Sequence, residues 1–172
     1  MADFLAAYNR TKKYEGGYAH VAGDRGGETY MGIARNMHPG WRGWGLLKKY
    51  QPLRYNQVVN DMAVEAAVQD YYREQFWSRI KGSGIMNQRL AELLYDYTVH
   101  SGNRGVKALQ KICGITADGV VGAVTLTTIN GRDAKTLFDA LKRERTIFLT
   151  QLSHQPGQAK FRTGWLNRVN SF

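Results

Sequence analysis

The sequence predicts a mainly α protein with a small irregular or β-containing lobe near the N-terminus and a helical bundle in the C-terminal half. Three observations support this fold class. Apolar residues make up 43% of the 172 residues, which is enough to bury a core. From residue 58 onward they recur at helical spacing through most of the chain. Residues 14–33, in contrast, hold six glycines in twenty positions, a pattern that favours turns over a stable helix.

Local signals predict the N-terminal elements. Residues 3–14 have one apolar helical face, with Asp3 as the expected N-cap. A glycine pair ends this helix, so Glu15 lies in or just after its last turn. Residues 18–33 are expected to form turns and a short hairpin, because glycines separate side chains that favour extended backbone. Residues 38–45, HPGWRGWG, are expected to form a loop that carries two tryptophans.

Helices are expected almost throughout the rest of the chain. Residues 58–77 carry apolar side chains at near-helical spacing, with Asn60 or Asp61 as the start signal. The KGSG turn at 81–84 follows and is the predicted boundary between two lobes. Further helices are expected at 87–102, 103–113, 122–130, 133–153 and 161–169, with turns at 118–119 and 155–157.

Charge and composition narrow the function classes. The chain carries 24 Lys and Arg against 14 Asp and Glu, a net charge of +10, which favours polyanionic partners such as nucleic acid, an acidic membrane face or the bacterial cell wall. No nucleic-acid recognition motif is present, so nucleic acid is not an expected partner. No apolar run reaches the ~18 residues of a membrane span, so membrane insertion is not expected either.

Cysteine and histidine usage predicts neither a disulfide nor a bound metal. Cys113 is the single cysteine and lies between apolar neighbours, where a buried thiol is expected. The four histidines are scattered without metal-ligand spacing. We therefore expect no metal site and no cofactor.

The first residues, MADFLAAYNRTKKYEGG, do not resemble a signal peptide. Lys12 and Lys13 follow the apolar stretch, which is short and interrupted by Asn9 and Arg10. We therefore expect synthesis in the cytoplasm without a signal peptide.

Three acidic residues stand in the glycine-rich stretch, and two of them suit glycosidase chemistry. Glu15, at a helix end beside open backbone, can face a cleft, where burial disfavours the ionised form; a protonated carboxyl is the general acid of a glycosidase. Asp24 is the candidate second carboxylate, and Thr29 is a candidate for orienting water. Glu28 is the rival, and its side chain would point to the face opposite Thr29 in an extended segment. Taken singly, each residue also fits an ordinary structural role.

A resemblance to a known family joins these residues. The run Glu15-Gly16-Gly17-Tyr18, followed by Asp24-x-Gly26-Gly27-x-Thr29 and Gly32-Ile33, closely resembles the signature of glycoside hydrolase family 108. These are muramidases of phage endolysins and of bacterial wall-remodelling or secretion-associated lysozymes. The resemblance continues through YYREQFW (71–77), 93–129 and FRTGWLNRV (161–169). The last two stretches are similar to the predicted peptidoglycan-binding region that follows the catalytic part in this family.

The resemblance implies a lysozyme-like fold with a catalytic lobe over 1–85 and a helical peptidoglycan-binding lobe over 86–172. It places the catalytic glutamate at Glu15 and the Asp and Thr of the motif at Asp24 and Thr29. The same order is similar to the catalytic trio of phage-type lysozymes, in which the gap from Asp to Thr is one residue longer. The roles of Asp24 and Thr29 therefore stay open.

Several residues are candidates for binding the sugar, because aromatic faces pack against pyranose rings. The candidate substrate-binding residues are Tyr18, Tyr30 and His100, with Trp41 and Trp44 as further aromatic platforms. Each of them also fits a packing role in the core.

The expected activity is that of a bacteriolytic peptidoglycan hydrolase, an N-acetylmuramidase that cuts the β-1,4 bond between N-acetylmuramic acid and N-acetylglucosamine with Glu15 as general acid. A lytic transglycosylase and a non-catalytic wall-binding module are the alternatives. Peptidoglycan is the expected partner, and a phage holin or a secretion machinery is the candidate route to the wall. Whether the anomeric configuration is retained or inverted depends on the separation of the carboxyl groups in space.

Overall fold

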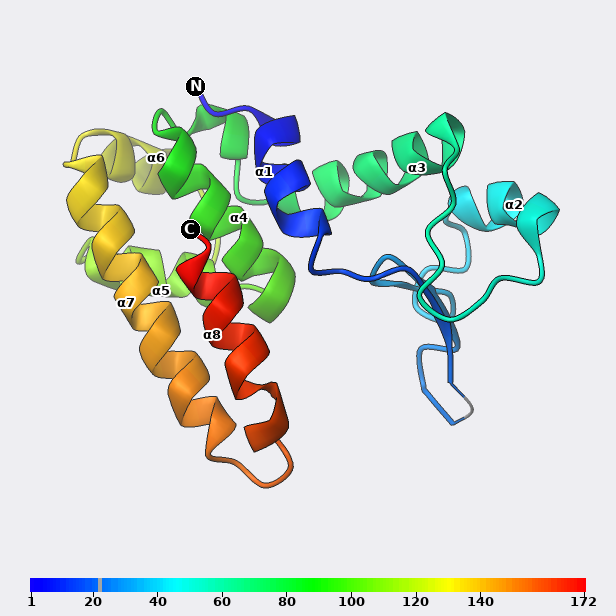
Figure 1. Ribbon diagram of the computed structural model, residues 1–172. Helices are drawn as coiled ribbons and strands as arrows, with labels where there is room; N and C mark the ends of the chain where they lie inside the picture. Colours follow the sequence, from blue (N-terminus) through cyan, green and yellow to red (C-terminus); the bar gives the residue numbers. More distant parts are fainter. Residues whose placement is uncertain (22) are drawn as a thin grey trace. The chain divides into compact units, whose positions relative to one another are not determined.

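The computed structural model describes residues 1–21 and 23–172. These residues form two compact units: Tyr8–Gln75, called here the N-terminal unit, and Met1–Ala7 with Phe76–Phe172, called the C-terminal unit. Helices dominate the chain (Figure 1), and a small antiparallel sheet lies near its N-terminus. The mainly α fold class is therefore confirmed.

The sheet of the N-terminal unit is the expected short hairpin with one strand added. It consists of β1 (Tyr18–His20), β2 (Glu28–Tyr30) and β3 (Ile33–Ala34), in the order β1-β2-β3. Thr29 at the middle of β2 is paired with Ala19 on one side and Ala34 on the other. Since alternate side chains of a strand point to opposite faces, Thr29 and Glu28 lie on different faces of this sheet.

The described N-terminal part of the chain contains three helices, and side chains cap the first and the third. The helices are α1 (Phe4–Lys12), α2 (Gly43–Leu47) and α3 (Met62–Tyr72), with a 3-10 turn at Lys48–Tyr50 and a π-helical turn at Arg73–Trp77. Asp3 Oδ1 accepts a hydrogen bond from the Ala6 N–H at 2.8 Å, as expected for an N-cap. Asp61 Oδ1 accepts from Ala63 and Val64 at 2.8 and 3.0 Å. The helix expected over 58–77 therefore starts later, directly after its cap.

The prediction of a loop over 38–45 is wrong for its last three residues, because α2 already begins at Gly43. The Trp41 ring covers Gly43 so closely that a Cβ there would lie 2.2 Å from ring atoms. The Trp44 indole N–H donates to the His38 carbonyl at 2.9 Å. These tertiary contacts stabilise a helix that its two glycines disfavour locally.

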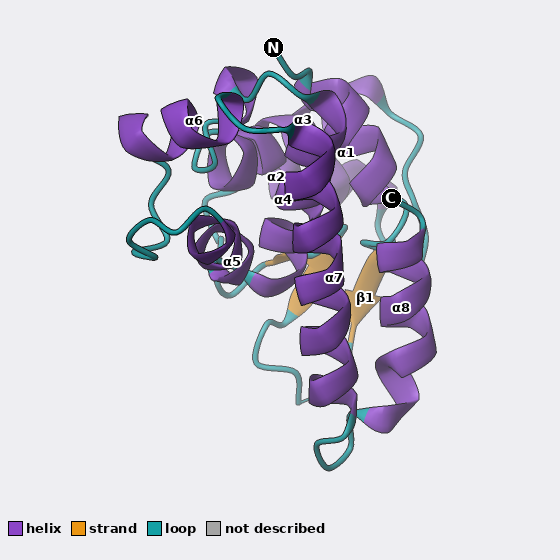
Figure 2. Ribbon diagram, turned by 90° about the vertical axis from the view of Figure 1, so that its left-hand side faces the viewer, coloured by secondary structure: helices purple, strands orange, loops and turns teal. Residues whose placement is uncertain are grey.

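The C-terminal unit is a bundle built around one buried helix. It contains a 3-10 turn at Gly82–Gly84, α4 (Gln88–Ser101), α5 (Arg104–Ile112), α6 (Ala123–Asn130), α7 (Ala134–Ser153), a 3-10 turn at Ala159–Phe161 and α8 (Arg162–Asn170). Residues 90–98 of α4 are all buried. The long helix α7 runs beside α8 as an antiparallel pair (Figures 1 and 2). The helices expected for this half of the chain are confirmed, and Cys113 is buried as expected.

An aromatic cluster explains the KGSG turn at 81–84. The rings of Phe4, Trp77 and Tyr95 pack edge to face, with centroids 5.7–6.1 Å apart. The Trp77 ring also covers Gly82, where a Cβ would lie 2.4 Å from ring atoms, and its indole N–H donates to Ser83 Oγ at 2.9 Å. A glycine is therefore required at the point where the turn passes the tryptophan.

No helix in the described residues combines the length and the apolar character that crossing a bilayer requires.

Candidate active site

The glycine pair after α1 fixes the place where the Glu15 side chain leaves the backbone. The N–H of Glu15 donates to the Lys12 carbonyl at 3.0 Å, which continues the turn beyond the helix. The N–H of Gly17 donates to Asn56 Oδ1 at 2.9 Å. A Cβ at Gly17 would lie 2.5 Å from the Asn56 carbonyl oxygen, so no larger residue fits at this position. The backbone is thus held before Glu15 by the bond to Lys12 and after Glu15 by a contact that requires glycine.

The Glu15 carboxyl lies against the backbone of Gly32. The side chain is half-buried, and a Cβ built on Gly32 would lie 3.1 Å from Glu15 Oε2 and 2.8 Å from the Tyr72 hydroxyl oxygen. Gly32 has φ +76°, a conformation that glycine adopts without strain. The buried Tyr72 hydroxyl donates to the Met31 carbonyl at 2.8 Å and thereby holds the same turn. Glu15 is therefore packed into the unit and is not a solvated residue at a helix end.

Asp24 and Thr29 converge on Gly26. Asp24 is exposed, and its Oδ1 accepts from the Gly26 N–H at 2.9 Å, which is an Asx turn. A Cβ on Gly26 would lie 3.5 Å from Asp24 Oδ1 and 3.7 Å from Thr29 Oγ1. Oxygen atoms of two sequence-predicted site residues thus lie close to the same glycine, beside the Ala34 methyl group at 3.1 Å from that Cβ position. The structure gathers Asp24 and Thr29 at Gly26, and Glu15 at Gly32.

The rival carboxylate, Glu28, is engaged by its neighbours. The Tyr18 hydroxyl donates to Glu28 Oε1 at 2.7 Å, and the Arg35 guanidinium pairs with Oε2. The bond from Tyr18, with the bond and charge of Arg35, lowers the pKa of Glu28 despite some burial, so this carboxylate is ionised at neutral pH. Burial and the bond to Glu28 raise the pKa of Tyr18. Glu28 therefore has a structural ion pair, and Tyr18 uses its hydroxyl to support it.

The aromatic candidates differ in accessibility. Tyr30 is 1% exposed, its hydroxyl accepts from the Val59 N–H at 3.0 Å, and its ring stacks with Trp41 at 6.3 Å. Trp44 is 5% exposed and packs edge to face on Trp41. The suggestion that Tyr30 and Trp44 serve as sugar platforms is corrected by this burial, because neither ring offers an open face. Trp41 remains half-exposed.

Trp41 borders an open cavity of the N-terminal unit. The cavity has a volume of about 460 Å³, and His38 and Tyr71 line it together with Trp41. The Tyr71 hydroxyl and His38 Nε2 lie 2.8 Å apart. Of the aromatic platforms suggested by the sequence, Trp41 is the one that this cavity exposes.

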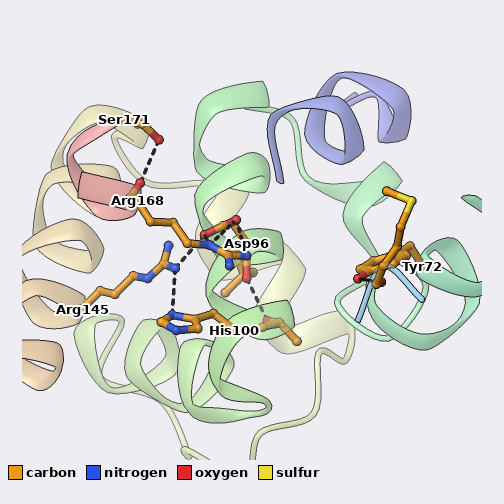
Figure 3. A network of polar contacts seen from close by, with 9 residues as sticks. Tyr72, Asp96, His100, Arg145, Arg168 and Ser171 are labelled. Carbon is orange, nitrogen blue, oxygen red and sulfur yellow. Dashed lines mark hydrogen bonds and ion pairs between the residues drawn. The ribbon is translucent and has the colours of Figure 1, made fainter. Parts of the chain in front are cut away.

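His100 belongs to the C-terminal unit and stands beside a buried ion cluster (Figure 3). Its ring lies 6.1 Å from that of Trp165, and its Nδ1 is 3.4 Å from Arg145 Nη2. Asp96 pairs with Arg145 at 2.6 Å and with Arg168 at 2.9 Å. Burial and the charges of Arg168 and Arg145 lower the pKa of His100 to about 4, so His100 is neutral at neutral pH. Its contacts are those of a packed histidine between helices.

Sequence reasoning missed two residues that shape the site. Tyr72 and Asn56 hold the turns beside Glu15, and both are far from it in the chain. Tyr72 belongs to the YYREQFW stretch that contributed to the family resemblance, and this stretch could have identified it. No sequence pattern pointed to Asn56. Among residues 1–21 and 23–172, no group of His, Cys, Asp or Glu side chains has the arrangement to hold a metal ion.

Comparison with known proteins covers nearly the whole chain. The family model described as glycosyl hydrolase 108 matches residues 8–102, and the model described as a predicted peptidoglycan domain matches residues 104–170. Among solved structures, Brucella abortus SagA is similar, with 30% sequence identity, a TM-score of 0.71, and coverage of 98% of this chain and 90% of that one. None of the curated proteins matches the chain. The match to 8–102 includes Glu15, Asp24 and Thr29.

Proposed function

This chain belongs to the glycosyl hydrolase 108 family, and we propose that it is a muramidase that cuts the β-1,4 bond between N-acetylmuramic acid and N-acetylglucosamine. Family membership makes it a glycoside hydrolase, and the second match makes peptidoglycan its substrate. The choice of bond and the roles of the residues are the proposal. The observation that carries it is the position of Glu15, half-buried against Gly32 in the matched region.

In the proposed reaction Glu15 donates its proton to the glycosidic oxygen as the bond to the muramic acid C1 breaks. The leaving N-acetylglucosamine keeps that proton as its new hydroxyl. Water then adds to C1, directly or after an intermediate, and the proton that it releases replaces the one that Glu15 gave up, so that the net reaction consumes one water. Asp24 and Thr29, which converge on Gly26, are the proposed guides for this water.

Product analysis tests this proposal. Purified peptidoglycan is digested, the new ends are reduced with borohydride, and the fragments are identified by mass spectrometry. A muramidase gives muramitol ends. Anhydro-muramoyl ends would instead identify a lytic transglycosylase, and glucosaminitol ends would move the cut to the other glycosidic bond. Binding without any released fragment would identify a non-catalytic wall-binding module.

Replacing Gly32 by alanine is expected to impair hydrolysis more than folding. The new Cβ would lie 3.1 Å from Glu15 Oε2 and 2.8 Å from the Tyr72 hydroxyl, so the carboxyl must move. We expect at least a roughly tenfold lower rate of peptidoglycan hydrolysis, because small displacements of a catalytic group are costly. The left-handed backbone should add about 1–2 kcal/mol of destabilisation. Turbidity clearing and a thermal melt measure the two effects.

Gly45→Ala is the matched control in the same unit. A Cβ at Gly45 meets no atom within 4 Å, and Gly45 lies inside α2. This variant should clear peptidoglycan at the wild-type rate. Full activity of Gly32→Ala would show that catalysis does not depend on the Glu15 carboxyl lying against Gly32.

A further inference from the structure

The positive charge of the chain is concentrated in the region that matches the peptidoglycan domain. Residues 104–170 hold eleven Lys and Arg against four Asp and Glu. This surplus of seven makes up most of the net charge of +10. The anionic partner suggested by the overall charge is therefore expected at this region.

Part of this charge lines a groove between α5 and α7. The groove has a volume of about 380 Å³. Its lining includes the cationic side chains Arg104, Lys107 and Lys111, the apolar Ala108 and Ile112, and the carboxylate Glu144. The three cations are exposed and recur along one face of α5, at steps of three and four residues.

Packing limits the freedom of the groove's charged side chains. The Arg104 guanidinium lies over the Phe148 ring, 3.9 Å from its centroid. The Lys107 stem lies close to Gly119, where a Cβ would be 3.0 Å from Cε. Glu144 Oε2 accepts a hydrogen bond from the Tyr97 hydroxyl at 2.8 Å. The groove thus combines a positioned cationic rim with a small apolar surface.

We propose that this groove binds the acidic peptide stems of peptidoglycan, an inference that rests on peptidoglycan being the substrate. The stem carboxylates carry the charge of the polymer, since the lactyl acid of each substituted muramic acid is consumed in an amide. Lys107 and Lys111 pair with these carboxylates. An alanine methyl group of the stem lies on Ile112, which is half-buried. The groove therefore recognises the peptide, while Glu15 in the N-terminal unit acts on the glycan.

A double substitution in the full chain tests the proposal. Lys107→Gln with Lys111→Gln removes two rim charges and leaves Arg104, which packs on Phe148, in place. The variants carry Glu15→Gln and are assayed in the cold by sedimentation with peptidoglycan stripped of attached polymers. We expect about tenfold weaker binding at low salt, and a smaller difference from the parent as salt screens the charges.

Lys81→Gln with Lys160→Gln is the matched control. Both lysines are exposed in the C-terminal unit and lie outside the groove, so this pair makes the same charge change elsewhere. It should bind nearly as the parent does. An equal loss of binding in both double variants would mean that the lysines act through general charge attraction and not through the groove. That result would overturn the proposal.

A soluble stem peptide supplies the second arm, measured by calorimetry against the parent and the groove variant. The peptide should bind the parent, and both amidation of its carboxyl groups and the groove variant should weaken this binding. Binding of the parent and the groove variant to duplex DNA and to anionic vesicles is measured alongside. The assignment would be refuted if the peptide does not bind, or if the groove substitutions weaken binding only to DNA or vesicles. Because binding is scored without cleavage, a failure of the muramidase proposal shows in the product analysis and a failure of this one shows here.

Discussion

Glu15→Gln is expected to abolish the clearing of purified peptidoglycan while the protein stays folded. Glutamine keeps the shape of the side chain but has no acidic proton to give to the glycosidic oxygen. Loss of a general acid costs about 10²–10⁴-fold in rate. The side chain is half-buried, and its carboxyl lies against Gly32, so an isosteric amide should fit the same place. Initial rates of clearing, with thermal melts of both proteins, measure the outcome.

Asp139→Asn is the control for this experiment. Asp139 is an exposed carboxylate of the C-terminal unit, so its substitution makes the same change from carboxylate to amide away from Gly32. It should leave the clearing rate within about twofold of wild type, as surface substitutions usually do. Clearing by Glu15→Gln at the wild-type rate would refute the role proposed for Glu15 without affecting the family assignment.

The elements that sequence predicted best are those with a local cause. Asp3, Asn87 and Asp133 each accept a hydrogen bond from the first turn of a helix, and such caps depend on neighbours three residues away. The turn at 118–119 is equally local: Asp118 Oδ1 accepts from the Val120 N–H at 2.8 Å. Short-range chemistry of this kind is visible in the sequence itself.

The features that sequence did not predict depend on contacts between distant residues. Helix α2 forms at a glycine because the Trp41 ring covers Gly43. The burial of Tyr30 depends on Trp41 and Val59. The setting of Glu15 depends on Tyr72, which lies at the end of α3 and far from Glu15 in the chain. The motif identified Glu15 as the candidate acid, but the contacts that hold its carboxyl in place come from residues distant in the sequence.

The largest expected loss of stability comes from the buried ion cluster of the C-terminal unit. The side chains of Asp96 and Arg145 are both 0% exposed, and that of Arg168 is 8% exposed. Asp96 Oδ2 accepts from Arg145 Nη2 at 2.6 Å, and Arg168 donates to both carboxylate oxygens of Asp96 through Nε and Nη2 (Figure 3). One carboxylate thus joins α4, α7 and α8. Since a buried charge without its partner is costly, the cluster depends on Asp96.

Asp96→Asn is therefore expected to lower the free energy of unfolding by about 3–5 kcal/mol, because two buried guanidinium groups lose their counterion. Asp139→Asn, which removes a surface pair with Lys135 at 2.6 Å, should cost less than ~1 kcal/mol. Urea unfolding of both variants measures the difference. Similar losses in the two variants would mean that Asp96 contributes no more than a surface carboxylate.

The same cluster predicts how stability depends on pH. Burial alone would raise the pKa of Asp96, but the charge of Arg145 and the hydrogen bonds and charge of Arg168 outweigh it and lower the pKa. The unfolded chain therefore takes up this proton more readily than the folded one. The stability that Asp96 contributes is present above about pH 4 and is lost as the pH falls further. Between pH 7 and pH 3 the free energy of unfolding should consequently fall more steeply in the wild type than in Asp96→Asn, and parallel pH profiles would contradict this assignment.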